Sequence, residues 1–99
     1  MGKYAPLGVF LRRWKRRNGN AHSVELTFIE VERIIAAPLP RGATTRDWWH
    51  NASRTERGFV QSRAWLSAGF EAQLLANTER VRFLRTDLHV LQRGERVRR

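Results

Sequence analysis

The stretch FVQSRAWLSAGFEAQLLANTERVRFLR, residues 59–85, decides the fold because two different periodicities follow each other within it. Its first part, residues 59–69, spaces apolar residues as one face of a helix does, and Gly69 suits the position after the last helical turn. Its second part, residues 70–85, alternates apolar and polar residues on both sides of a turn at 76–79. The stretch therefore predicts a helix followed by a β-hairpin.

The side chains of these two elements divide into an inward set and an outward set. We expect the inward set to comprise Phe59, Trp65, Leu66, Ala68, Phe70, Ala72, Leu74, Val81 and Phe83. The polar residues remain for the surface: Gln61, Arg63 and Ser67 on the helix, and Arg80, Arg82 and Arg85 as a basic rim on the second strand. A helix followed by a basic hairpin resembles a winged-helix arrangement.

Upstream, residues 23–35 (SVELTFIEVERII) predict a short strand that passes into a second helix. Thr27 and Glu30 form the T-x-x-E pattern of a capping box, in which each side chain accepts a hydrogen bond from the other residue's backbone N–H. The apolar residues that follow recur on one helical face and are expected to be buried. With these elements, the sequence predicts an α+β fold of three to four short helices followed by a C-terminal β-hairpin.

A further helix is expected over residues 6–17, because one apolar stripe recurs at i, i+3, i+4 and i+7, namely Leu7, Phe10, Leu11 and Trp14. The Asn-Gly-Asn sequence at 18–20 is expected to end it in a left-handed conformation. The surface of this helix carries five cations, namely Arg12, Arg13, Lys15, Arg16 and Arg17. A solvated face and a phosphate-binding face are both consistent with this cluster.

The sequence RDWWHN at 46–51 places two tryptophans among polar residues that are capable of chemistry. An enzymatic interpretation would use Asp47, His50 and Asn51 as a nuclease-like metal cluster. That cluster lacks a second histidine at a metal-binding spacing. We therefore predict no catalysis, no metal and no cofactor.

The paired tryptophans are better explained as scaffold, because a small domain needs large side chains to close its core. We expect one of them to pack with Trp14, Trp65 and Phe28. The other is expected near the surface, where it would serve as a contact for a base or for a partner protein.

The charge of the 99-residue chain is its most pronounced compositional feature, with 19 Lys and Arg against nine Asp and Glu and a net charge of +10. Residues 1–20 carry six cations and no anion, so the excess begins at the N-terminal end. This distribution favours a polyanionic partner. Cysteine is absent, and no apolar run approaches the roughly 20 residues that span a bilayer. We expect a cytoplasmic protein with no membrane contact, a single domain over 1–91 and a flexible basic tail over 92–99.

Five blocks of the sequence, KYAPLGVFL, LTFIEVERIIAAPLP, WWHN, QSRAWLSAGF and VRFLR, resemble a small bacterial and phage domain of unknown function over residues 3–85. The resemblance implies a compact α+β domain that ends in a hairpin, and it implies no established activity. Members of that family often carry a histidine in the link after W-W-x-N. The corresponding link in this chain, ASRTERGFV, has none.

The first functional hypothesis is a non-enzymatic nucleic-acid-binding domain, with DNA as the expected ligand and RNA as the second choice. By analogy with winged helices, Gln61 and Arg63 would contact base edges, while Arg54 and Arg57 would contact phosphates. The hairpin arginines and the cationic N-terminal helix would hold the backbone. The alternative is a small phage or mobile-element interaction module that docks on an acidic protein partner through its arginines and a tryptophan.

Overall fold

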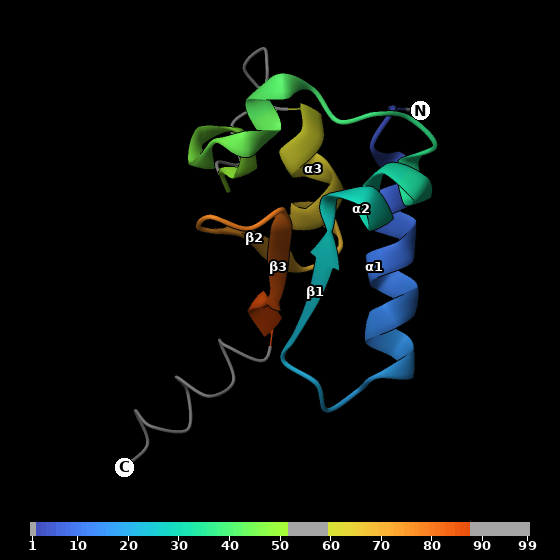
Figure 1. The fold of residues 1–99 in the computed structure, drawn as a ribbon. Coiled ribbons are helices and arrows are strands. Elements are labelled where there is room, and N and C mark those ends of the chain that lie inside the picture. The colour runs from blue at the N-terminus through green and yellow to red at the C-terminus, as the bar shows by residue number, and fades with distance from the viewer. Residues whose placement is uncertain (1, 52–59, 88–99) are drawn as a thin grey trace.

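The computed structural model describes residues 2–51 and 60–87. The described chain folds into three α-helices, two 3-10 turns and a three-stranded sheet. The helices pack together with the sheet (Figure 1). In chain order the elements are α1 (Ala5–Arg17), β1 (Ser23–Thr27), α2 (Phe28–Ile35), the 3-10 turns η1 (Arg41–Thr44) and η2 (Arg46–Trp49), α3 (Val60–Ser67), β2 (Phe70–Leu75) and β3 (Arg80–Arg85). The α+β fold predicted from the sequence, with its C-terminal hairpin, is confirmed.

The sheet is antiparallel, and its strand order is β1-β3-β2. The strand between the first two helices therefore pairs with the second strand of the hairpin, which becomes the central strand (Figure 1). In this register Arg82 stands between Glu25 of β1 and Gln73 of β2. Because side chains alternate across a sheet, these three residues share one face.

The local signals in the sequence set the ends of the helices. Thr27 Oγ1 accepts a hydrogen bond from the Glu30 backbone N–H at 3.0 Å, and Glu30 Oε1 accepts one from the Thr27 N–H at 2.8 Å. The predicted capping box is thus confirmed at the start of α2. Gly69 follows α3 with φ +88°, a left-handed conformation in which a side chain would be strained.

The end of α1 differs from the prediction of a left-handed stop. Asn18 has φ −121°, and both its backbone N–H and its side-chain amide donate to the Trp14 carbonyl at 2.9 Å. The Asn18 N–H thus makes the last i→i−4 bond of the helix, and the Asn18 side chain caps the same Trp14 carbonyl.

One face of the sheet forms the floor of the core. Val81 and Phe83 of β3 and Phe70 of β2 point to this face and are fully buried. Leu7 and Leu11 of α1, Val31 of α2 and Trp65 of α3 belong to the same buried cluster. The opposite face carries exposed residues such as Arg80, which places the helices on one side of the sheet.

The tryptophan pair is largely scaffold, as the sequence indicated. Trp49 is 2% exposed, and its ring stacks on Phe28 and Trp65 at centroid distances of 5.8 and 5.5 Å. Its indole N–H donates to the Ala43 carbonyl at 2.7 Å. Trp48 is half-buried. The expected packing of Trp14 with this group is wrong, because Trp14 meets Phe70 instead, at 6.1 Å.

Within residues 2–51 and 60–87, no helix is long and apolar enough to cross a membrane. Phe59, Arg54, Arg57 and the basic tail at 92–99 lie outside the described residues, so the predictions made for them are not tested here.

Candidate nucleic-acid interface

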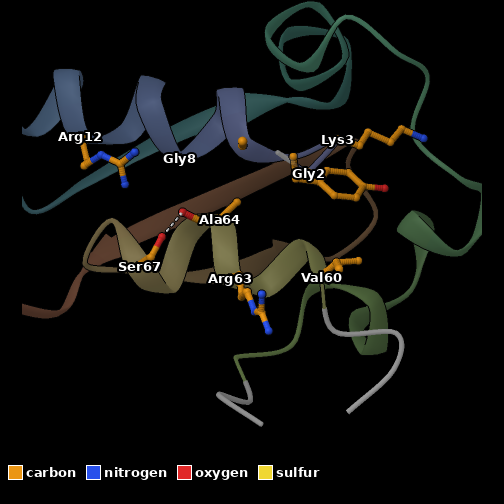
Figure 2. A pocket seen from close by; sticks show the side chains of 10 residues that line it. Gly2, Lys3, Gly8, Arg12, Val60, Arg63, Ala64 and Ser67 are labelled. Carbon is orange, nitrogen blue, oxygen red and sulfur yellow. Dashed lines mark hydrogen bonds between the residues drawn. The ribbon is translucent and has the colours of Figure 1, made fainter. Parts of the chain in front are cut away.

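Helices α1 and α3 approach each other closely at Gly8 and Ala64, which face each other in Figure 2. A Cβ atom placed on Gly8 would lie only 2.9 Å from the Ala64 carbonyl oxygen. Glycine at this position therefore permits the backbones to pack at a distance that any side chain would prevent.

A hollow of about 400 Å³ runs along this crossing. Gly8 of α1 lines one side, and Val60 and Ala64 of α3 line the other (Figure 2). Tyr4, just before α1, also lines the hollow. These lining residues are apolar or aromatic, and together they form what we call the floor of the hollow. Lys3, Arg12 and Arg63 also line this hollow.

A second hollow of about 490 Å³ continues toward the C-terminal ends of the two helices. It shares Arg12 and Ser67 with the first and adds Lys15 and Arg16. The two hollows therefore meet, and we refer to both together as the α1–α3 groove. Figure 2 shows Arg12 on α1 near the C-terminal end of α3 and Arg63 on α3 itself.

The α1–α3 groove is positively charged. Arg12, Arg16 and Arg63 are exposed, and none of them forms an ion pair with a carboxylate in the described part of the chain. No aspartate or glutamate is among its described lining residues. Guanidinium groups without internal carboxylate partners are available to an anionic ligand.

Lys15 differs from these arginines because its ammonium group has partners within the fold. Its Nζ donates to the Ala68 carbonyl at 3.1 Å and lies 5.9 Å from the centre of the Phe70 ring. This lysine ties the end of α1 to the end of α3, where carbonyl groups favour a cation.

Tyr4 contributes the aromatic surface of the groove. Its ring meets Trp48 edge-on at 5.6 Å, and the ammonium of Lys3 lies 5.7 Å from its centre. Burial raises the pKa of the Tyr4 phenol above its ordinary value of 10.0, because the charged form loses solvation.

The hairpin arginines are partnered, in contrast to those of the groove. Arg82 lies 2.8 Å from a carboxylate oxygen of Glu25, and Arg80 lies 3.8 Å from the other oxygen of the same carboxylate. Both extend from the sheet face opposite the helices. Their predicted role as a basic rim is thus reduced by a shared glutamate.

Arg85, predicted as a surface contact, is instead buried at 8% exposure. It falls on the inward face of β3 together with Val81 and Phe83, since alternate residues share a face. Its Nη1 donates to the carbonyls of three residues in the loop after α1, and its other nitrogens bond Asp87. The role of Arg85 in this structure is to close that loop onto the sheet.

Gln61 was also predicted at the surface, and this too is corrected by its burial at 5% exposure. It lies one helical turn before Trp65 and shares the inward face of α3. Its side-chain amide donates to the Trp48 carbonyl at 3.1 Å. Gln61 therefore cannot reach a base edge in this conformation, whereas Arg63 is exposed.

The remaining predicted cations of α1, Arg13 and Arg17, are exposed but line neither part of the groove. The helix thus presents two basic surfaces, of which only one faces α3. Arg13 and Arg17 match Arg12 and Arg16 in residue type, helix and exposure.

The RDWWHN segment provides structural contacts to α3 and β2. The Asn51 side chain accepts hydrogen bonds from the Ala72 N–H at 2.7 Å and from the Trp65 indole at 3.0 Å. Its amide also donates to the Ala72 carbonyl at 3.0 Å. Among residues 2–51 and 60–87, no three His, Cys, Asp or Glu residues gather in a way that could hold a metal ion.

No curated protein and no solved structure shows significant similarity to the chain. The model of one family matches residues 9–87, which contain nearly all of the described fold. The chain therefore belongs to DUF7662, a family of domains of unknown function.

Proposed function

We propose that this protein is a non-enzymatic nucleic-acid-binding domain that holds the phosphate backbone along the α1–α3 groove. The observation that carries the proposal is the row of exposed arginines, Arg12, Arg16 and Arg63, without internal carboxylate partners in the described chain. A nucleic-acid backbone carries phosphates at regular intervals, so several phosphates can lie along the groove at once. Arginine binds a phosphate with two parallel hydrogen bonds.

The winged-helix-like order of helices and strands supports DNA as the ligand by analogy of fold. The analogy is weaker for base recognition, since Gln61 is buried and Arg63 is the one exposed member of the predicted base-reading pair. The proposal therefore rests on backbone contacts, which position a protein on nucleic acid without reading its sequence.

The experiment is a titration of labelled duplex DNA against the full chain by fluorescence anisotropy at several salt concentrations. Each phosphate contact contributes about 0.9 to the slope of log affinity against log salt. The Arg12→Ala/Arg16→Ala variant should therefore show a slope smaller by about 1.8. Both side chains are exposed, so circular dichroism and urea unfolding should be nearly unchanged.

The matched control is the Arg13→Ala/Arg17→Ala variant, which removes the same charge from the other surface of α1. It should leave a slope closer to that of the wild type. Equal slopes for the two variants would place the contact elsewhere than the groove. Absence of salt-dependent binding by the wild type would overturn the proposed function itself.

A further inference from the structure

Resting on the proposed function, we infer that the α1–α3 groove accepts an unpaired nucleotide, so that the domain prefers single strands or frayed ends over blunt duplex. The apolar floor would hold the base, and the arginines at its rim would hold the adjoining phosphates.

The composition of the groove fits both halves of a nucleotide. Tyr4 offers an aromatic surface, and Val60, 62% exposed, offers an aliphatic one on the opposite helix. Bases stack on aromatic rings whatever their sequence, because every base has a π-face. A volume of about 400 Å³ also lies within the range of sites that enclose small ligands.

A base can reach the floor of the groove only when it is not held in a base-paired duplex. Inside a duplex both faces of a base are covered by neighbours, and taking it out of the stack costs a few kcal/mol. A base in a single strand or at a frayed end has little of this cost to overcome. The apolar floor between α1 and α3 would then contribute only to binding of the unpaired form.

Charge alone predicts the opposite preference. A duplex carries more phosphate per unit length than a single strand, and its salt slope per contact is steeper, about 0.9 against 0.7. A purely electrostatic surface should therefore bind duplex at least as well. A preference for the single strand would therefore require a non-electrostatic contribution to the binding free energy, such as the stacking of a base on the floor of the groove.

The test compares three labelled probes at matched salt, namely a short single strand, the same sequence as a blunt duplex, and that duplex with a single-stranded overhang. Loss of one stacked base weakens binding by about fivefold or more, the equivalent of about 1 kcal/mol. Tyr4→Leu and Val60→Ser should each weaken the single strand and the overhang by this factor. Binding of the blunt duplex should change by less than about twofold, since the arginines are intact.

Two control variants separate this contact from general damage. Ile29→Ser removes a comparably exposed aliphatic side chain, 57% exposed, from α2 and should change no affinity. Tyr4→Phe keeps the ring and should bind single strands as the wild type does. Unfolding by urea checks that Tyr4→Leu, which loses its contact with Trp48, remains folded.

The outcomes distinguish the inference from the function on which it rests. Equal affinity for all three probes, or loss of affinity that is the same for single strand and duplex, would overturn the inference while leaving nucleic-acid binding in place. Absence of salt-dependent binding to every probe would overturn both. If Tyr4→Leu unfolds, Val60→Ser decides the question, because an exposed valine has little part in the core.

Discussion

The arginines of the groove and those of the hairpin are the same residue in two different electrostatic settings. Arg12, Arg16 and Arg63 have no carboxylate partner in the described chain, whereas Arg80 and Arg82 share Glu25. Arg85 is buried among carbonyl oxygens. The number of cations in a segment is thus a poor measure of the charge that it offers to a ligand. The partners of each guanidinium determine whether it stabilises the fold or remains available for binding.

The largest effect is expected when Arg85 is replaced by alanine. The change removes the guanidinium that bonds Asp87 and three carbonyls of the loop after α1, and breaking a buried charged contact of this kind costs about 3 kcal/mol. Urea unfolding measures the loss. Arg82→Ala, on the exposed face of the same strand, should cost less than about 1 kcal/mol. A similar loss of unfolding free energy in the two variants would contradict the different roles given to the inner and outer arginines of the hairpin.

A smaller effect is expected for Glu25→Gln, which removes the carboxylate shared by Arg80 and Arg82. The ion pairs are exposed, so the free energy of unfolding should fall by less than about 1 kcal/mol. The salt slope of nucleic-acid binding should change little, because both arginines lie on the sheet face opposite the helices. A clearly steeper slope would show that the hairpin belongs to the interface once its glutamate is removed.

The smallest effect concerns Tyr4, the single tyrosine of the chain, whose ionisation can be followed by tyrosinate absorbance. Its pKa should lie above 10.0, because burial disfavours the charged phenolate. The folded state then binds this proton more tightly than the unfolded state. Stability from this group is therefore complete below pH 10 and falls as the pH rises through the folded pKa.

Occupation of the groove by an oligonucleotide should raise the pKa of Tyr4 further, because the ligand adds negative charge and removes water. A pKa at or below the ordinary value, or no response to a bound single strand, would separate Tyr4 from the groove.

Local elements were predictable from the sequence because their signals lie within a few residues. The capping box of Thr27 and Glu30, the glycine at 69 and the alternation of the hairpin each depend on neighbours in the chain. The burial of Arg85 was also predictable, because alternate residues of a strand share a face and Arg85 alternates with Val81 and Phe83. Its charge indicated an exposed position, whereas the strand periodicity indicated the buried position that Arg85 occupies.

The groove itself depends on contacts between distant residues. Gly8 in the interior of a helix and the small residue Ala64 both permit another helix to approach closely. No local sequence pattern indicates that these two residues contact each other. Gln61 shows the same limit, because its hydrogen-bond partner is the Trp48 carbonyl in a separate turn. The pairing of β1 with β3, which brings Glu25 to the hairpin arginines, is likewise set by tertiary contacts.

The amide of Asn51 has a consequence for behaviour at high concentration. It donates to and accepts from the backbone of Ala72 on β2, at the border of the sheet, as an adjacent strand would. An unprotected border is a template on which other chains can add and aggregate. One side chain thus satisfies the Ala72 backbone at a point of this border where an intermolecular strand would otherwise pair.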